Sequence, residues 1–303
     1  MTGHAAVQQV GTVARLGLTP LKGAAHSHPE RIAVRRDEVV GDRRWALIQP
    51  ATGGWRIVRT VESPKMTAVR ARCAAGGVLH LELPDGRRYL VDGAHTGGVV
   101  AEYWGRPAHV HLVPGLWDGA LSELLGREVH LVTVDRAGAV VFAEPVSVVT
   151  TASVLEVARR AGVSGDAPGG DGDGHSDGER GDGDGDGDGD GDGDDGDGDG
   201  GVDDERFRST LVIDTPGLSA FAEDGWVGGR LQVGPVELIV RQRLARCAVI
   251  RIRPGAGVVG GPDPLRLLAA DRVVNGEVVF GLGAEVAVPG EIAVGDPVRL
   301  TRA

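Results

Sequence analysis

Hydrophobic and polar residues alternate along most of this chain in short runs. A period of two turns alternate side chains to opposite faces of a strand, as expected when one face is buried. Gly, Pro or Asp separates most of these runs, which lie at residues 12–18, 31–36, 44–49, 55–60, 67–72, 78–83, 129–134, 210–214, 231–240 and 278–282. Many short strands between turn residues are typical of a barrel or a sandwich, so the pattern predicts a mainly β fold.

Helical spacing of apolar residues occurs in three places, at residues 116–127, 151–162 and 263–270. In the second stretch Ser153 precedes Glu156 by three residues, which predicts a capping box at the start of a helix. In the third stretch Asp263 is the expected N-cap, and Pro264 occupies the first turn. We therefore expect a few short helices among the strands.

The chain of 303 residues is long enough for two domains, each with its own core. We place the boundary near the first predicted helix, which gives domains at residues 1–125 and 126–303. No apolar run approaches the roughly 18 residues of a membrane helix. The first residues lack the pattern of a secretory signal, and only two cysteines occur. These features predict a cytoplasmic protein that does not span a membrane.

The formal net charge of −11 is distributed unevenly. An Asp/Gly-rich tract at residues 164–205 holds 18 of the 43 acidic residues, so the rest of the chain carries about +6. The tract has almost no apolar residue to bury, which predicts a disordered acidic insertion in a surface loop. Its DGDGDG repeats lack the glutamate and the flanking helices of a calcium loop. The mildly basic remainder suits an anionic ligand.

Cys247 lies among arginines at positions 243, 246, 251 and 253. If residues 243–253 form a strand, the cysteine shares a face with Arg243 and Arg251, opposite a mostly apolar face. Nearby guanidinium groups favour the thiolate, which is a nucleophile or a soft metal ligand. A small buried residue is the alternative, and the spacing does not decide between them. Cys73 ends an alternating run without such charges, and we expect it to be structural.

Lysine is rare, and Lys22 and Lys65 are the only two. Lys22 precedes a glycine in a predicted loop, where the backbone can approach an anion; an ordinary exposed lysine is the alternative. The stretch from Leu211 to Gly217 looks like part of a GTPase, but no Gly-x-x-x-x-Gly-Lys-Ser/Thr motif accompanies it. Gly-x-Ser-x-Gly and a Gly-x-Gly-x-x-Gly that opens a helix are also absent, which disfavours hydrolase-elbow and Rossmann folds.

Eight stretches, taken in order, resemble the MOSC family with its N-terminal barrel domain, to which the amidoxime reducing components belong: TVARLGLTPLKG, GDRRWALI, RFRSTLVID, FAEDGW, LQVGPVELIV, LARC, VVFGLGAEV and PGEIAVGDPVRL. The resemblance extends over nearly the whole chain except the acidic insertion. It implies a two-domain, β-barrel-like fold that binds the molybdenum cofactor, Mo-molybdopterin, in a positively charged cleft.

The family pattern also implies which residues form the site. Cys247, in the Arg-Cys motif, matches the thiolate ligand of the metal and is the implied catalytic residue. The other positions that match the cofactor-binding pattern are Lys22, Arg43, Arg208, Thr210 and Arg246. The chain departs from the pattern at Gly23, where a serine is usual, and at Thr210, where the motif has asparagine. Gly283 stands where the amidoxime reducers have a tyrosine.

The resemblance implies a reductase of small N-oxygenated compounds such as hydroxylamines or amidoximes. With two cysteines the chain has no thiolates for an iron–sulfur cluster of its own, so we expect a separate electron-donor protein of the ferredoxin or cytochrome type. The alternative is a non-redox module that binds the cofactor or carries persulfide sulfur on Cys247 during cofactor maturation. An aromatic content of 4% gives no sign of nucleic-acid binding.

Overall fold

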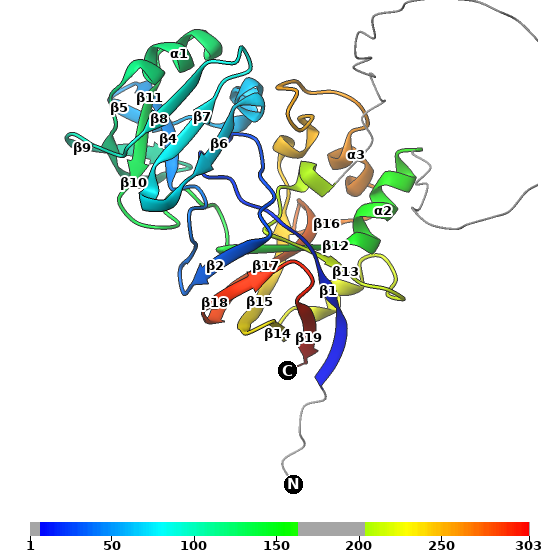
Figure 1. Ribbon diagram of the computed structural model, residues 1–303. Coiled ribbons are helices and arrows are strands. Elements are labelled where there is room, and N and C mark those ends of the chain that lie inside the picture. Colours follow the sequence, from blue (N-terminus) through cyan, green and yellow to red (C-terminus); the bar gives the residue numbers. More distant parts are fainter. Residues whose placement is uncertain (1–6, 163–203, 303) are drawn as a thin grey trace, which may run out of the picture.

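The computed structural model describes residues 7–162 and 204–302, and it has the mainly β fold that the alternation predicts and the two barrels that the family resemblance implies (Figure 1). The first barrel is closed by five strands in the order β10-β11-β4-β5-β9. Their bounds are β4 (Trp45–Ala51), β5 (Gly54–Ile57), β9 (Gly98–Tyr103), β10 (Arg106–Leu112) and β11 (His130–Val134).

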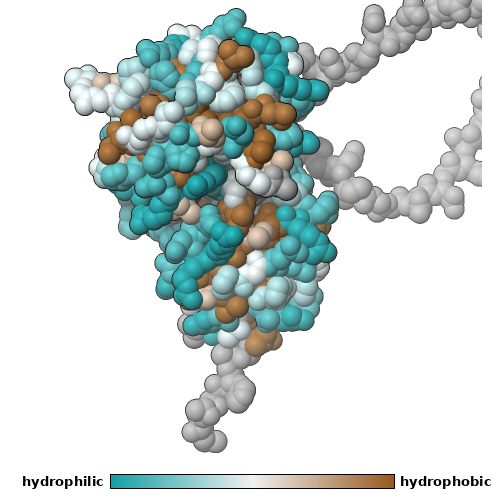
Figure 2. Space-filling model, turned by 60° about the vertical axis from the view of Figure 1, so that its left-hand side comes forward, coloured by the Kyte–Doolittle hydropathy of each residue, from teal (hydrophilic) through white to brown (hydrophobic). Residues whose placement is uncertain are grey.

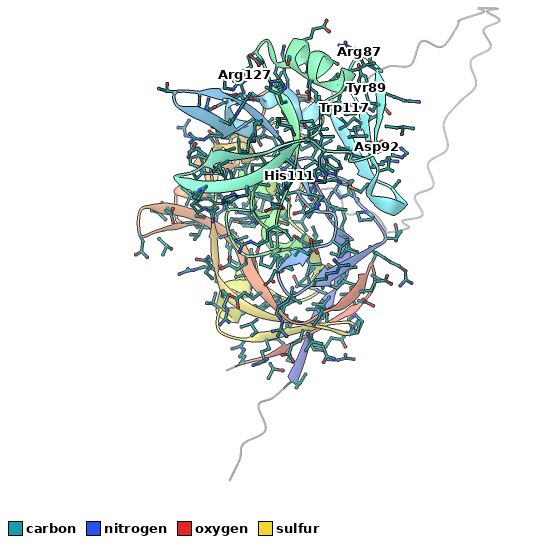
Figure 3. The ribbon with its side chains drawn as sticks, turned by 90° about the vertical axis from the view of Figure 1, so that its left-hand side faces the viewer. Arg87, Tyr89, Asp92, His111, Trp117 and Arg127 are labelled. Carbon is teal, nitrogen blue, oxygen red and sulfur yellow. The ribbon has the colours of Figure 1, made fainter. Side chains whose placement is uncertain are left out.

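A three-stranded sheet and one helix accompany this barrel: β6 (Arg70–Cys73), β7 (Leu79–Glu82), β8 (Arg88–Val91) and α1 (Leu116–Leu125). Leu79, Leu81 and Leu121 are fully buried in one apolar cluster that these elements share. Beside that cluster, Arg87 donates a hydrogen bond to Glu123 of α1 at 2.9 Å, and the Trp117 ring lies on the same side (Figure 3). The small sheet is therefore fixed to α1.

The second barrel is built from a sheet in the order β12-β13-β1-β19-β14-β15-β17-β16, and an additional pairing of β12 with β17 closes it. Its strands are β1 (Val7–Leu16), β12 (Val146–Thr150), β13 (Leu211–Asp214), β14 (Arg230–Val233), β15 (Val236–Ala245), β16 (Val273–Val274), β17 (Glu277–Val288) and β19 (Pro297–Thr301). A small sheet of β18 (Gly290–Ala293), β2 (Arg31–Arg35) and β3 (Glu38–Val39) packs against it. The largest apolar cluster of the protein fills this region, and hydrophilic residues cover much of the outer face that Figure 2 shows.

The two halves of the chain exchange strands. β1 lies between β13 and β19 of the second barrel, although it begins the chain, and β11 closes the first barrel, although it follows residue 125. The boundary between residues 125 and 126 therefore stays a prediction. Of the expected disordered insertion at residues 164–205, only the last two residues fall within the described part of the chain.

All three predicted helices form: α1, α2 (Thr151–Arg160) and α3 (Pro264–Ala269). Asp263 caps α3 as expected, because its side chain accepts a hydrogen bond from the backbone of Arg266. The capping box at Ser153 is wrong. Thr150 is the N-cap of α2, and the Ser153 hydroxyl instead donates to Glu223 at 2.8 Å. Within residues 7–162 and 204–302 no helix is long and apolar enough to cross a bilayer.

The predicted strand at residues 243–253 is also wrong beyond its first residues. β15 ends at Ala245, and the 3-10 helix η6 (Ala248–Arg251) begins directly after Cys247. The Ile250 backbone N–H donates to the Cys247 carbonyl at 3.3 Å, which closes the turn. Ile250 is buried because this turn packs against an apolar cluster outside the barrel. The alternation of apolar and polar residues after position 245 therefore does not reflect a strand. The other 3-10 helices are η1 (Thr60–Glu62), η2 (Pro64–Ala68), η3 (Ala75–Gly77), η4 (Asp204–Phe207) and η5 (Ala222–Trp226).

Candidate functional site between the two barrels

Lys22 lies in the connection between β1 and β2, beside the first barrel. Its backbone N–H donates to the Trp45 carbonyl at 2.8 Å. Its Nζ donates to the Tyr103 hydroxyl at 3.1 Å and stands 4.8 Å from the centre of that ring. Gly23 follows with a φ of 89°, and an added Cβ would lie 2.9 Å from Thr60 Oγ1. A glycine therefore suits this position, where the family motif usually has serine.

Arg43 and Arg208 both adopt left-handed backbone conformations, with φ of 46° and 50°. Such values are uncommon outside glycine and are often found at functional sites. Arg43 forms an ion pair with Asp42. Arg208, which follows η4 of the second half of the chain, reaches back to the connection that holds Lys22. Its Nη2 donates to Thr19 Oγ1 at 3.2 Å and to the Ala24 carbonyl at 2.5 Å.

A buried histidine continues this contact between the two halves. His26 Nδ1 is 2.8 Å from Thr19 Oγ1, and its Nε2 is 3.1 Å from the Ser209 carbonyl. Because a carbonyl only accepts, Nε2 carries the proton, and Nδ1 accepts from the Thr19 hydroxyl. Burial, together with the nearby Arg208, lowers the pKa of His26 well below 6.5. His26 is therefore neutral and orients Thr19 toward Arg208.

Positive charge at this place exceeds negative charge. Burial lowers the pKa of Lys22 to about 7, with further lowering by Arg43 and Arg208. Burial and Arg43 also lower the pKa of Arg208 to about 10. Asp42 opposes both shifts, but its carboxylate is already paired with Arg43. Cations in this state are stabilised by an anion that enters among them.

Cys247 belongs to the same electrostatic group. Its side chain is exposed, and a thiolate at this position would oppose the lowering that burial causes in the pKa values of Lys22 and Arg246. The sequence predicted Arg243 and Arg251 as the charged neighbours of Cys247. In the structure both arginines pair with carboxylates instead: Arg251 lies 3.0 Å from Asp263, and Arg243 lies 3.6 Å from Asp224. Lys22 comes instead from a segment more than 200 residues earlier, brought close by the packing of the two barrels.

The second cysteine has different surroundings. Cys73 is half-buried at the end of β6 and packs against the apolar cluster beneath α1. Burial raises the pKa of its thiol, which keeps it protonated. These surroundings agree with a structural role.

The remaining positions implied by the resemblance have structural partners. Thr210 Oγ1 lies 3.2 Å from both the backbone nitrogen and the hydroxyl of Ser147, and the Thr210 N–H donates to Ser147 Oγ at 2.9 Å. Thr210 therefore ties β13 to β12. Arg246 bonds to two backbone carbonyls, as described below.

Glu144 explains one departure from the family pattern. A Cβ added to Gly283 would lie 2.2 Å from Glu144 Oε2, so this carboxylate fills the room that a side chain at position 283 would need. Glu144 Oε1 accepts a hydrogen bond from Gln242 at 2.8 Å. A tyrosine at position 283 would not fit unless Glu144 moved.

Sequence reasoning missed Tyr103, Thr19 and Asp42 as parts of this site. Tyr103 is one of only two tyrosines, and that rarity was the single signal available. The arrangement as a whole fits a phosphate-bearing group that also presents a soft metal ion, because cations with lowered pKa values gather beside an exposed thiol. A recess between His26 and Arg208 has only about 10 Å³ of free space, enough for one water molecule. This recess is therefore too small to hold a larger ligand.

Two family models match the chain. The MOSC N-terminal beta barrel domain matches residues 10–105, and the MOSC domain matches residues 189–299. Together the two ranges cover more than half of the sequence. The chain belongs to the MOSC family. Lys22 and Arg43 lie within the first match, whereas Arg208 and Cys247 lie within the second, so the site joins two MOSC modules.

Curated relatives of this MOSC protein include mitochondrial amidoxime-reducing component 1 of Homo sapiens, which is 34% identical over 102 residues. Mitochondrial amidoxime reducing component 2 of Rattus norvegicus is 31% identical over 102 residues. Each match covers 31% of this chain and 29% of the relative, so less than a third of either protein is aligned. Among solved structures, the alignment with a crystal structure of the YUAD protein from Bacillus subtilis includes 98% of each chain, with a TM-score of 0.45 and 9% sequence identity.

Proposed function

We propose that this MOSC protein binds the molybdenum cofactor and reduces small N-oxygenated compounds, with Cys247 as the thiolate ligand of molybdenum. The observation that supports this function best is the meeting of an exposed thiol with Lys22, Arg43 and Arg208, of which only Arg43 is paired with a carboxylate, that of Asp42. The names of the relatives support the reductase class, because they are amidoxime-reducing components.

Each residue has a separate task in this function. Lys22, Arg43 and Arg208 hold the cofactor phosphate, since charge-assisted hydrogen bonds to phosphate are stronger than neutral ones. Cys247 supplies the soft sulfur ligand that a thiophilic metal prefers. The resemblance also implies Thr210 and Arg246, which support the site from outside it, because Thr210 bonds to Ser147 and Arg246 bonds to the carbonyls of Phe280 and Phe207. When bound, the cofactor supplies the two-electron chemistry, and the protein supplies position and charge.

The overall reaction consumes two electrons and two protons. An N–OH group becomes N–H, the N–O bond breaks, and the oxygen leaves as water. The electrons come from a separate donor protein of the ferredoxin or cytochrome type. A cytoplasmic location remains part of this proposal.

Molybdenum content tests the proposal directly. Protein purified from a host supplied with molybdate should contain about one molybdenum per chain, and Cys247→Ser should lose nearly all of it. Cys73→Ser is the matched control and should keep the metal. Reduction of an amidoxime with chemically reduced methyl viologen as electron source should follow the molybdenum content of the three proteins.

Two results would overturn this assignment. Wild-type protein without molybdenum from the supplied host would exclude the cofactor. Persulfide on Cys247 in such metal-free protein, detected by mass spectrometry, would support a sulfur carrier, for which the exposure of this thiol is suitable.

A further inference from the structure

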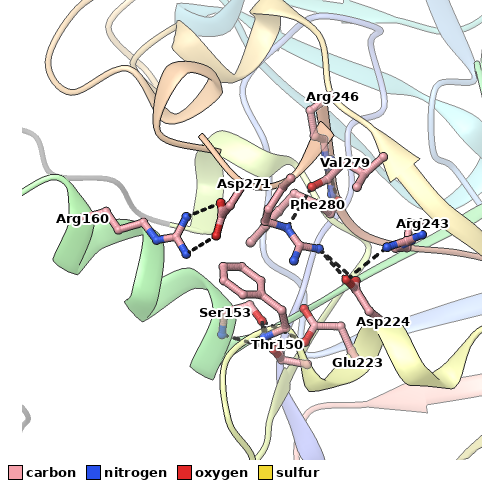
Figure 4. Close-up of polar contacts among 12 residues, drawn as sticks. Thr150, Ser153, Arg160, Glu223, Asp224, Arg243, Arg246, Asp271, Val279 and Phe280 are labelled. Carbon is pink, nitrogen blue, oxygen red and sulfur yellow. Dashed lines mark hydrogen bonds and ion pairs between the residues drawn. The ribbon is translucent and has the colours of Figure 1, made fainter. Parts of the chain in front are cut away.

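Arg246, next to the proposed metal ligand, directs its guanidinium into the protein. Its Nε donates to the Phe280 carbonyl at 2.7 Å, and its Nη1 donates to the Phe207 carbonyl at 3.0 Å. Figure 4 shows the Arg246 side chain beside Val279 and Phe280 of β17. Two of the three guanidinium nitrogens are thus used by backbone oxygens of other segments.

The third nitrogen does not face the open site either. Nη2 is buried and has no hydrogen-bond partner among the residues that the structure describes. It lies over Gly281, where an added Cβ would be 3.0 Å from Nη2 and 2.5 Å from the Val148 carbonyl. Gly281 also has a φ of 69°, which disfavours other residues. The glycine therefore leaves the room in which the Arg246 fork lies.

Arg246 joins three segments that meet at the site. Its backbone N–H donates to the Val278 carbonyl at 2.7 Å, and its side chain lies against the rings of Phe207 and Phe280, whose centres are 4.2 Å apart. Phe207 directly precedes Arg208, and Arg246 directly precedes Cys247. One guanidinium thus anchors the chain on the N-terminal side of both residues.

We infer that Arg246 is a positioning residue that holds Cys247 and Arg208 in register and does not itself contact the bound anion. This inference rests on the proposed function, because that function assigns Cys247 to the metal and Arg208 to the phosphate. It also revises the role that the resemblance implies for Arg246, namely direct contact with the cofactor. The distinction is testable in protein that contains no cofactor.

Phosphate affinity separates the two roles through a double-mutant cycle. Inorganic phosphate is titrated calorimetrically into unloaded wild type, Arg246→Lys, Arg208→Lys and the double variant. If Arg246 acts through Arg208, Arg246→Lys weakens binding about tenfold in the wild-type background and less than about twofold in the Arg208→Lys background. An equal loss in both backgrounds means that Arg246 contacts phosphate independently, and it overturns the inference.

Alkylation of Cys247 gives a second readout. Iodoacetamide labelling of the Cys247 peptide, followed by mass spectrometry, should change in rate about threefold in Arg246→Lys and in Gly281→Ala, because the loosened turn no longer holds the thiol in a fixed position. Arg243→Lys is the matched control, since this arginine of β15 lies three residues before Arg246 but faces Asp224, and the labelling rate of this variant should not change. Unchanged rates in both test variants would contradict the positioning role.

Folding is checked by circular dichroism, and Arg246→Gln replaces Arg246→Lys if the latter is unfolded. Neither readout needs molybdenum. A coupled double-mutant cycle in a protein that never binds molybdenum would therefore reject the proposed function and retain the positioning role of Arg246.

Discussion

Two groups of basic side chains in this protein differ in how their charges are balanced. Around Asp224 two arginines share one carboxylate: Arg272 Nη2 lies 2.9 Å from both Asp224 oxygens, and Arg243 approaches the same group at 3.6 Å (Figure 4). Arg160 binds Asp271 through two hydrogen bonds of 2.7 and 2.9 Å. In this region opposite charges pair and tie helices and strands together.

Between the barrels the balance is different. The Lys22 ammonium group donates a hydrogen bond to the Tyr103 hydroxyl, while the Asp42 carboxylate is paired with Arg43. The Glu205 carboxylate partly opposes the lowering of the pKa of Arg208, but its Oε1 already lies 2.8 Å from His28 Nε2. Lys22 and Arg208 are partly buried without counter-charges of their own, and their pKa values fall as a result.

The difference indicates two uses of the same side chains. Paired charges contribute to the fold, because removing one partner leaves the other buried and uncompensated. Unbalanced charges are kept at a cost in stability, which a bound anion offsets. The region without counter-charges is therefore the better candidate for a ligand site, although arginine occurs in both.

The largest expected effect is on stability. Asp224→Ala should lower the free energy of unfolding by about 2–3 kcal/mol, because Arg272, with only 8% of its side chain exposed, loses its partner. Lys22→Met should change it by less than about 1 kcal/mol at pH 7, since the lost bond to Tyr103 and the relieved repulsion oppose each other. Urea unfolding measures both.

Asp271→Ala is the control for this comparison. Asp271 also pairs with an arginine, but 52% of its side chain is exposed, so its loss should cost less than about 1 kcal/mol. Equal destabilisation by Asp224→Ala and Lys22→Met would mean that the two regions do not differ in charge balance.

Ligand affinity should show the opposite ranking. Lys22→Met should weaken phosphate binding by about tenfold in unloaded protein, because one charge-assisted hydrogen bond is lost. Lys65→Met removes the other lysine, which is exposed, and should leave affinity unchanged. Asp224→Ala should also leave it unchanged at a temperature where the variant is folded. Calorimetric titration decides, and a loss shared by both lysine variants would indicate a general effect of net charge.

Much of the fold follows from local sequence patterns. Period-two alternation predicted the strands, and the cap at Asp263 marked the start of α3, because both signals act between neighbours along the chain. The closure of the barrels was harder to foresee. β1 pairs with β19 nearly 300 residues later, and no local rule records such a pairing.

The site shows the same limit more sharply. Motif resemblance points to Lys22, Arg43, Arg208 and Cys247, but the strand face that the alternation predicts for Cys247 does not exist. Its charged neighbours come from other segments. Tyr103 bonds to Lys22 across 81 residues, and Thr19 meets Arg208 across 189. Such contacts depend on how the two barrels pack, which the spacing of residues along one segment cannot reveal.

A pH dependence of stability isolates Lys22, which is surrounded by Arg43, Arg208, Tyr103, Cys247 and Asp42. Its pKa is about 7 in the folded protein and about 10.4 in an unfolded chain. Between these values the unfolded state binds more protons, so unfolding free energy should rise with pH from about 7 to 10, by at most about 1.4 kcal/mol per pH unit.

Urea unfolding at pH 7, 8 and 9 measures this slope in wild type and in Lys22→Met, and the difference between them isolates the lysine. The variant should have the flatter profile. Saturating phosphate should flatten the wild-type profile as well, because a bound anion keeps Lys22 charged in the folded state. If the variant and the wild type have the same slope with and without phosphate, Lys22 is already charge-balanced, and the contrast with the Asp224 region disappears.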